Sequence, residues 1–339
     1  MFHPKYSLSP ALFTEITQIE RLYGQIEALR VPQQLEINLT RNNLIESSYA
    51  SNKIEGNPLT LPEVTNLLLD DRVPVNRSEK EVVNYFDLLK SLSSLQQDPL
   101  QLEMVKTMHG KLLEGVDKTA GSIRNVPVIV GKYTGEPGNV TLKVKHNPPF
   151  HTEVEISQSL KELCDWANAE KEMPAVIRAG VFHHQFVYIH PFEDGNGRVC
   201  RLLTALLFMK AEYEINRYFI LDDYYDIDRH QYSDKLHSAD SGDKTDWLLY
   251  FSEGVKHSMQ SALFRLKEAM KTLPVKNRPT GKEGEVLKLF ETHTELLSQD
   301  IVQSLKVTRQ QAHNLLSGLV KKGFLKKEGS TKSSYYVMK

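Results

Sequence analysis

Apolar residues recur at helical spacing over most of the chain. The first clear stripe follows Ser9 and Pro10, a favourable N-cap and a proline at the first helical position. Its members lie three or four residues apart and mark one helix face: Leu12, Ile16, Ile19, Tyr23 and Ile26. Similar stripes and cap signals predict helices over 32–56, after 60, 78, 98 and 152, over 174–189 and 196–207, and across 222–262. The pattern therefore predicts an all-α fold.

One segment, residues 126–145, departs from helical spacing. A run with β-type character at 126–130 is followed by a turn rich in glycine and proline and by a second such run at 141–145. Two runs joined by turn residues predict a β-hairpin. An isolated hairpin is only marginally stable in water, so we expect it to lie against the helical body.

The last part of the chain has a different composition. A segment rich in Pro, Gly and Lys at 272–284 predicts a linker. Residues 275–339 carry twelve Lys or Arg against six Asp or Glu, a net charge of +6, which leaves −7 for residues 1–274. Three short helical stripes, the second beginning near Ser298 and the third after Thr308, precede a hairpin that follows Gly323. This order predicts a winged-helix domain over 280–339.

Bulk composition excludes several classes of protein. The chain of 339 residues has 40% hydrophobic and 25% charged residues and a net charge of −1, which is typical of a globular protein without a general affinity for polyanions. It contains no apolar run long enough to cross a bilayer and no signal-peptide pattern at its start. Its two cysteines, Cys164 and Cys200, fall in apolar helical patterns and predict buried thiols. Together these features indicate a cytoplasmic protein that does not enter a membrane.

The segment HPFEDGNGRVCR, residues 190–201, concentrates chemically active residues. Proline after His190 ends the preceding helix, and the next helix begins near Asn196. Gly195 and Gly197 allow a tight turn and a close approach to a ligand. Free amide groups at the helix N-terminus attract an anion, and Arg198 and Arg201, one turn apart, suit phosphate oxygens.

Two further residues of this segment suggest a reaction. Asp194 places a carboxylate among cations, which indicates a divalent metal bridging it to phosphate. His190 has an ordinary pKa of ~6.5 and can accept a proton near neutral pH. A base, a metal ligand and an anion cradle together indicate attack of a hydroxyl group on a nucleotide phosphate.

A hydrolytic metal cluster is the rival interpretation, because His183 and His184 lie close in sequence to His190 and Asp194. Adjacent helical residues project about 100° apart, however, so one ion is hard to reach from both histidines. A buried, hydrogen-bonded histidine is the simpler interpretation for one of them.

The same segment resembles the signature of the Fic-domain family, HPFxDGNGRxxR, at all nine specified positions. The resemblance implies a helical bundle with a hairpin flap, and transfer of AMP from ATP to a Ser, Thr or Tyr hydroxyl of a protein bound along the flap. It implies that His190 is the general base and Asp194 the Mg²⁺ ligand. The implied contacts to phosphate are Gly195, Asn196, Gly197, Arg198 and Arg201, and Arg201 binds the γ-phosphate. Tyr232 is implied to lie near the nucleotide's adenine base.

A second motif lies earlier in the chain, in SNKIEGN at 51–57. Glu55 falls in the last turn of a predicted helix, where a carboxylate opposes the helix dipole at ~0.3–1 kcal/mol. Taken alone, it is a solvated side chain. Ser51, Glu55 and Gly56 are similar, however, to the inhibitory motif [S/T]xxxE[G/N] of Fic proteins, which implies that Glu55 pairs with Arg201 and blocks productive ATP binding. The expected regions are then 1–100 with the inhibitory helix, 101–271 as catalytic core and 280–339.

Other functions stay open at this point. One is a transcriptional regulator whose winged helix binds DNA while the nucleotide site only senses. Another is transfer of a different nucleotide, or removal of AMP, because a phosphate cradle does not select the base. The third helix of the C-terminal domain would present its outward side chains to DNA or to a protein, and a homodimer is also possible; these side chains are Arg309, Gln310, His313 and Asn314.

Overall fold

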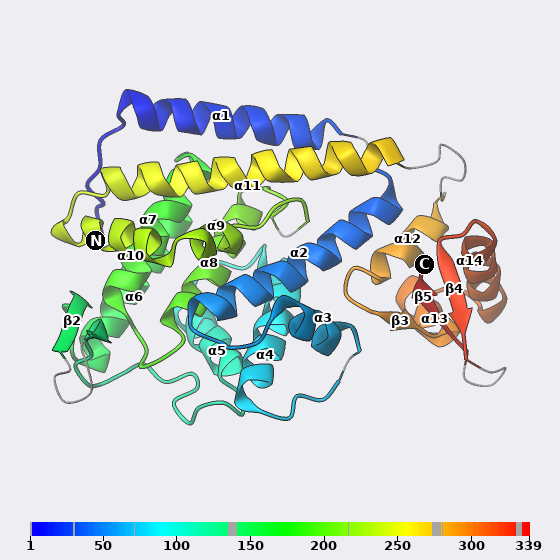
Figure 1. The fold of residues 1–339 in the computed structure, drawn as a ribbon, viewed down its shortest axis with the longest axis horizontal. Coiled ribbons are helices and arrows are strands. Elements are labelled where there is room, and N and C mark those ends of the chain that lie inside the picture. The colour runs from blue at the N-terminus through cyan, green and yellow to red at the C-terminus, as the bar shows by residue number, and fades with distance from the viewer. Residues whose placement is uncertain are drawn as a thin grey trace.

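The structure is a computed structural model, and it describes residues 2–29, 31–70, 72–134, 141–215, 217–272, 279, 281–329 and 334–339. It is mostly helical, which confirms the predicted fold class (Figure 1). The helices of the large unit are α1 (Pro10–Glu27), α2 (Gln33–Ile54), α3 (Leu61–Leu69), α4 (Arg77–Ser91), α5 (Leu102–Leu112), α6 (Glu153–Ala169), α7 (Ala175–Ile189), α8 (Asn196–Lys210), α9 (Asp222–Ile227), α10 (Arg229–Ser238) and α11 (Thr245–Thr272).

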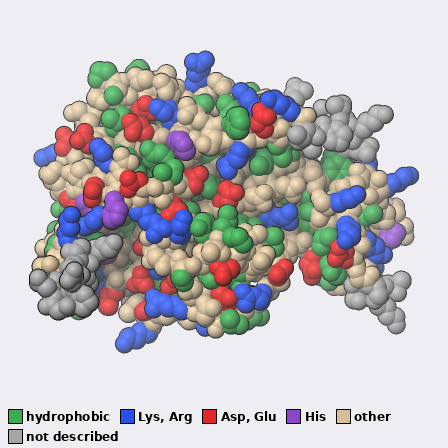
Figure 2. Space-filling model, in the orientation of Figure 1, with side chains coloured by type: hydrophobic (Ala, Val, Ile, Leu, Met, Phe, Trp, Pro, Cys, Tyr) green, Lys and Arg blue, Asp and Glu red, His purple; other side chains and the backbone are tan. Residues whose placement is uncertain are grey.

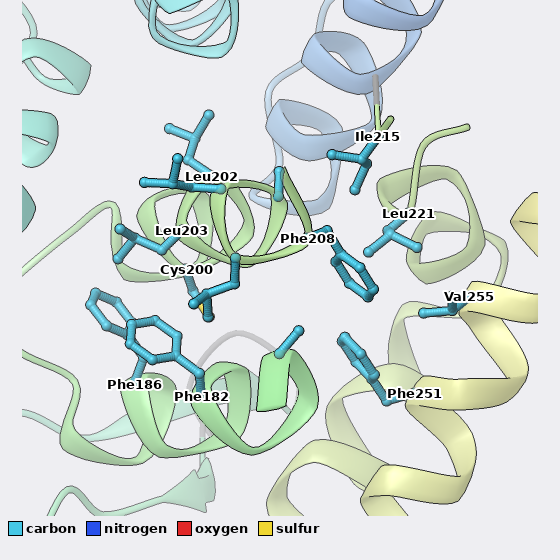
Figure 3. Packing of buried hydrophobic residues seen from close by; sticks show 14 of the residues in the cluster. Phe182, Phe186, Cys200, Leu202, Leu203, Phe208, Ile215, Leu221, Phe251 and Val255 are labelled. Carbon is cyan, nitrogen blue, oxygen red and sulfur yellow. The ribbon is translucent and has the colours of Figure 1, made fainter. Parts of the chain in front are cut away.

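The main core lies where α7, α8 and α11 meet (Figure 3). Phe182 and Phe186 of α7 face Cys200 and Leu203 of α8. Phe208 of α8 lies beside Phe251 of α11, with ring centroids 6.3 Å apart. On the outer side α1 lies along α11, side by side over most of their length (Figure 1). All five residues of the stripe predicted for the first helix are buried. The apolar periodicity therefore predicted correctly which face of α1 is buried.

Local capping decides where the helices begin. Ser9 caps α1, and Thr152 and Glu155 form a capping box at the start of α6, where a helix was predicted. The cap predicted at Ser78 is wrong, because the Asn76 carboxamide, two residues earlier, accepts the Glu79 amide at 2.9 Å and starts α4 at Arg77. The helix predicted after Pro99 begins three residues later than expected, at Leu102.

The predicted hairpin is present as strands β1 (Val130–Thr134) and β2 (Thr141–His146). They pair antiparallel, with Thr134 opposite Thr141, and the turn between them lies outside the described residues. The first strand begins at Val130 rather than at Val126, because the Val126 carbonyl accepts a hydrogen bond from the Arg124 guanidinium instead of joining a ladder. Lys145 of β2 reaches Asp234 of α10 at 3.2 Å, so the hairpin rests on the helical body.

A smaller unit lies at one end of the molecule (Figure 1). It contains α12 (Lys282–Leu289), α13 (Ser298–Leu305), α14 (Arg309–Lys321) and strands β3 (Glu295–Leu296), β4 (Leu325–Glu328) and β5 (Tyr335–Met338) in the order β3-β5-β4. Most of the predicted linker lies outside the described residues, but α12 begins within it, at Lys282. The predicted outward residues of α14 are exposed. The winged-helix assignment and its DNA or protein partner stay predictions.

Helix α2 connects the two units. Its Ile37 is fully buried in the apolar cluster of the smaller unit, beside Phe290 and Leu316. Near its other end, Ile45 packs with α3 and α4 in a separate cluster. A single helix therefore joins the core of the smaller unit to the body of the large one.

The surface carries no segregated charge on the face shown in Figure 2, where basic and acidic side chains are intermixed. Both cysteines are buried thiols, as predicted. Among the described residues, no helix combines the length and the apolar character needed to cross a bilayer.

The central cluster predicts a large difference between two phenylalanines of the same helix. Phe251 of α11 is fully buried, whereas Phe264, further along α11, is 67% exposed. Phe251→Ala should lower the free energy of unfolding by ~3–5 kcal/mol, because it leaves a cavity between α7, α8 and α11. Phe264→Ala should change it by ~0.5 kcal/mol or less. Denaturant unfolding measures both, and equal effects would contradict this packing.

Candidate active site

The loop between α7 and α8 holds the residues of the central motif in a strained backbone conformation. His190 ends α7 with φ 51° and ψ 64°, in the left-handed region that residues other than glycine seldom adopt. Gly195 precedes α8 with φ 77°, where glycine carries no steric penalty. The two positive φ angles reverse the chain sharply, so that the imidazole and the start of α8 lie at the same place.

A buried arginine outside the motif stabilises this loop. The Arg124 side chain donates to the carbonyls of His190 at 2.6 Å and Ile189 at 3.2 Å, and also to those of Val126 and Phe150. Arg124 is only 2% exposed, and its contacts are all main-chain oxygens. Arg124 was not among the predicted site residues, although an arginine just before the apolar start of the predicted hairpin is a usable signal.

The motif also supports itself from within. The Asn196 carboxamide accepts the Phe192 amide at 2.9 Å and donates to the Phe192 carbonyl at 2.8 Å. Phe192 is fully buried and stacks on His109, with ring centroids 3.6 Å apart. His109 accepts the Gly121 amide at Nδ1, so its Nε2 carries the proton and donates to the Asp194 carbonyl at 3.1 Å. The Asn196 side chain thus shapes the turn, and His109 is a second supporting residue that the sequence did not reveal.

His190 lies in an environment that favours its neutral form. Burial lowers the pKa of His190 to about 4, and the nearby His146 and Arg124 act in the same direction. The centroid of the His146 ring lies 6.4 Å from that of His190. A neutral imidazole at pH 7 is the form that can accept a proton.

Arg201 projects from the first turns of α8 into the interior, where its side chain is 2% exposed. Its NH2 donates to Glu55 Oε1 at 2.7 Å and to the Ser51 carbonyl at 3.0 Å, and its Nε donates to Ser51 Oγ at 2.7 Å. Asp222 lies 3.7 Å from Nε. Burial lowers the pKa of Arg201, but the negative charges of Glu55 and Asp222 more than offset this and raise it above its ordinary value. The guanidinium is therefore a fixed cation held mainly by α2.

Glu55 occupies the space directly above the N-terminal turn of α8. It is the C-cap residue of α2, and Gly56 follows with φ 90°, a left-handed conformation. A Cβ placed on Gly197 would overlap Glu55 Oε1. The carboxylate thus lies against the bare glycine backbone as well as on Arg201, in the position that an anion bound at this helix terminus would take. Ser51, Glu55 and Gly56 are therefore brought to the same place as the central motif.

Arg198 and Asp194 form a separate part of the site, in which Arg198 is buried and Asp194 is partly exposed. The Arg198 NH2 lies 3.3 Å from Asp194 Oδ1, and its NH1 lies 3.6 Å from Glu81. The other Asp194 oxygen contacts the exposed Arg77 at 3.2 Å, and the Asp194 side chain is 43% exposed. Arg198 and Arg201 are thus paired with different carboxylates instead of sharing one anion. Asp194 remains open to solvent, as a metal ligand requires.

The remaining predicted residues lie deeper. Tyr232 is 6% exposed and its ring stacks on Tyr225 with centroids 4.5 Å apart. Its hydroxyl lies 2.8 Å from His183 Nε2, and His183 Nδ1 lies 2.9 Å from Thr204. The role of Tyr232 near a nucleotide base stays a prediction, since its contacts in this structure are those of a core residue.

The adjacent histidines do not join His190 and Asp194. His183 bonds to Tyr232 and Thr204, whereas His184 bonds to Asp240 and Lys244. Both are buried and hydrogen-bonded, and they point to different partners, as expected for neighbours on a helix. The rival cluster of both histidines with the motif is therefore wrong.

Comparison with protein families and known proteins agrees with this geometry. Residues 99–208 match the model of the Fic/DOC family. A relative named protein adenylyltransferase fic-1, from Caenorhabditis elegans, is 31% identical over 234 residues, covering 66% of this chain and 41% of the relative. Protein adenylyltransferase Fic of Culex quinquefasciatus is 28% identical over 271 residues, covering 76% and 50% respectively. The chain therefore spans about half the length of these curated relatives or less.

Two solved structures share the fold. A Fic family protein from Desulfovibrio desulfuricans G20 superimposes on this chain with a TM-score of 0.64 at 24% identity. The superposition covers 100% of this chain and 98% of the chain from D. desulfuricans. Fic-1 from C. elegans, residues 134–508, gives a TM-score of 0.61 at 25% identity. That superposition covers 77% of this chain and 73% of the Fic-1 chain. The first resemblance thus includes the smaller C-terminal unit.

The buried histidines predict that acid weakens the fold. Burial lowers the pKa of His183 well below its ordinary value, so this ring stays neutral in the folded state and takes up a proton only on unfolding. The unfolded state then binds more protons below about pH 6.5, and stability falls as the pH is lowered. The His183 contribution to the free energy of unfolding should drop by ~1–2 kcal/mol between pH 7 and pH 5.

His183→Gln tests this assignment, because its amide can donate to Thr204 and accept from Tyr232 but does not titrate. Denaturant unfolding at the two pH values should show a smaller loss in the variant than in the parent. The same loss in both proteins would show that His183 is not held neutral.

Proposed function

The chain belongs to the Fic/DOC family, and we propose that it transfers AMP from ATP to a Ser, Thr or Tyr hydroxyl of a protein and is held inactive by its own Glu55. The observation that carries this proposal is the Glu55 carboxylate, which lies on Arg201 and against Gly197 at once. A carboxylate there occupies the position that the proposed reaction requires for the terminal phosphate.

The start of α8 supports phosphate binding in this account. The first amide groups of a helix lack intrahelical partners and carry partial positive charge. Gly197 has no side chain to keep a phosphate from this backbone. Arg201 contributes a buried, permanently charged guanidinium with the fork geometry that suits phosphate oxygens. Once Glu55 leaves, Arg201 requires a new anion, and the γ-phosphate supplies one.

Asp194 fits the proposed Mg²⁺. One protein carboxylate together with substrate phosphates is a common way to hold this ion. Asp194 is partly exposed, next to the start of α8, and one of its oxygens contacts only the exposed Arg77 among the described side chains. A bound Mg²⁺ supplies neutralisation of phosphate charge.

His190 supplies the base. Its pKa of about 4 leaves the ring neutral at pH 7, so it can take the proton from the target hydroxyl as that oxygen bonds to the α-phosphorus of ATP. The bond between the α-phosphorus and its bridging oxygen breaks, and pyrophosphate leaves. The proton stays on His190 until it is released to solvent, and the products are protein-AMP and pyrophosphate.

The hairpin offers a surface for an extended protein segment. Ile129, just before β1, and Val144 of β2 are 56% and 51% exposed, which is unusual for apolar side chains. The hairpin has only two described strands, so its outer edges are available for pairing with another chain. Strand addition at such an edge would bring a target hydroxyl toward His190.

Intramolecular inhibition follows from the strength of the Glu55 contact. A hydrogen bond between charged groups contributes ~1.5–3 kcal/mol, which corresponds to a roughly ten- to hundredfold shift between blocked and open states. Glu55→Gly should therefore raise self-adenylylation by about 10–100-fold, measured as added AMP mass on the intact protein with Mg²⁺ and ATP. Glu55→Gln, which keeps the length but loses the charge, should fall between the parent and Glu55→Gly.

Lys53→Gly is the matched control, because Lys53 lies in the same last turn of α2 but pairs with Asp226. It should label like the parent, since a disturbed helix end alone does not free Arg201. Equal labelling of Glu55→Gly and the parent would contradict the inhibitory role. Parallel incubations with the other nucleoside triphosphates identify the preferred base.

His190 should be required for transfer but not for nucleotide binding. In the Glu55→Gly background, His190→Ala should abolish AMP addition, because it removes the imidazole that accepts the hydroxyl proton. ATP affinity, measured by calorimetry with Mg²⁺, should change less than about threefold. Undiminished AMP addition would remove His190 from its role as base.

A further inference from the structure

A cluster of basic side chains gathers around one carboxylate where the hairpin meets the helical body. Asp240 lies in the 3-10 turn η2 (Ala239–Ser241) that follows α10. His146, the last residue of β2, has its Nδ1 2.7 Å from Asp240 Oδ2, and His237 of α10 has its Nδ1 3.2 Å from the same oxygen. The ligand atoms of these three residues all lie within 4.8 Å of one another. The proposed reaction uses none of them.

The hydrogen bonds of His146 determine where its proton lies. Its Nε2 is 2.9 Å from the Tyr188 carbonyl, which can only accept, so Nε2 carries the hydrogen. In the neutral ring Nδ1 then bears a lone pair, and this lone pair faces the Asp240 oxygen. Two acceptors at 2.7 Å need a cation between them, either a second proton or a metal ion.

A second pair of residues, His184 and Lys244, orients Asp240 through its other carboxylate oxygen, Oδ1. Lys244 donates to His184 Nδ1 at 2.7 Å, so His184 carries its hydrogen on Nε2 and donates it to Asp240 Oδ1 at 3.0 Å. This leaves Oδ2 directed toward His146 and His237. Ligands of a metal ion are commonly held in this manner, by hydrogen bonds from outer residues that set their tautomer and orientation.

The two histidines that face Oδ2 lie close enough to share one ion with it. Their rings are nearly parallel, with an interplanar angle of 16° and centroids 5.1 Å apart. With the His237 hydrogen on Nε2, the Nδ1 lone pair of His237 also faces Oδ2. A single divalent ion would then satisfy both lone pairs and the carboxylate together.

We propose that His146, His237 and Asp240 bind a divalent transition-metal ion, with zinc as the best fit. Two imidazoles and a carboxylate suit zinc, which accepts three protein ligands and keeps a fourth position open. Zinc–nitrogen distances of ~2.0–2.1 Å place tetrahedral neighbours about 3.3 Å apart. The observed separations of 2.7 and 3.2 Å therefore need only a small opening.

Such an ion would tie the hairpin to the helical body beside the active site. His146 comes from β2, whereas His237 and Asp240 come from α10 and η2. None of its ligands lies in the central motif, although the His146 ring is 6.4 Å from that of His190.

The test uses the full chain without an affinity tag, treated with a chelator and then titrated with Zn²⁺ in a calorimeter and with Co²⁺ in a spectrophotometer. We expect one ion per chain, and visible Co²⁺ absorption of the intensity typical of four-coordinate sites. His237→Gln should weaken Zn²⁺ binding at least tenfold; the His237 side chain is only 12% exposed but lies at the edge of the cluster.

His230→Gln is the matched control on the same helix, because His230 is exposed and outside the cluster. It should bind Zn²⁺ like the parent. A second measurement covers folding: Zn²⁺ at a concentration that saturates the parent should raise the melting temperature of the parent and of His230→Gln more than that of His237→Gln. Binding of less than one ion per chain, or equal binding by His237→Gln and the parent, would overturn the proposal and leave a proton as the shared cation.

Discussion

The buried guanidinium of Arg201 is the constraint around which the site is organised. A charge removed from water needs oppositely charged or hydrogen-bonding partners. Removing one partner of a buried ion pair lowers the free energy of unfolding by several kcal/mol. Ser51 and Glu55 of α2 provide most of these partners, and Asp222, itself hydrogen-bonded to Ser47 of α2, adds a further negative charge. The position of α2 against α8 is therefore set by electrostatics as much as by apolar packing. The same contacts explain why the α2 sequence is unusually polar for a buried helix.

This arrangement gives one helix two attachments. Near its start, α2 buries Ile37 in the apolar core of the smaller unit, and Glu36 pairs with Arg217 of the large unit. At its end it places Glu55 over the start of α8. Glu55 lies eighteen positions after Ile37, which corresponds to about 27 Å of helix. The smaller unit and the phosphate site are thus attached to opposite ends of the same rigid element.

The sequence was most informative where function depends on neighbouring residues. The loop from His190 to Arg201, the helical stripes and the hairpin were predictable, because each is encoded by local spacing and turn chemistry. The residues missed act across long separations. Arg124 bonds to His190 from 66 positions away, and His109 bonds to Asp194 from 85 positions away. The cluster around Asp240 unites residues up to 94 positions apart and has no local signature.

The misplaced helix starts have a more local cause. Asn76 and Ser78 are both acceptable caps, and the choice between them rests on where the preceding loop leaves the chain. Tyr232 shows a different limit of prediction from sequence. The family resemblance suggests a role near the nucleotide base, whereas the observed contacts of Tyr232 are those of a core residue.

A crystal structure of the Glu55→Gly protein with Mg²⁺ and ATP would show whether Arg201 holds the terminal phosphate once Glu55 is gone. We expect γ-phosphate oxygens within hydrogen-bonding distance of the Arg201 guanidinium, with the α-phosphorus facing His190. A triphosphate bound elsewhere, while Arg201 stays turned toward Ser51 and Asp222, would contradict this expectation.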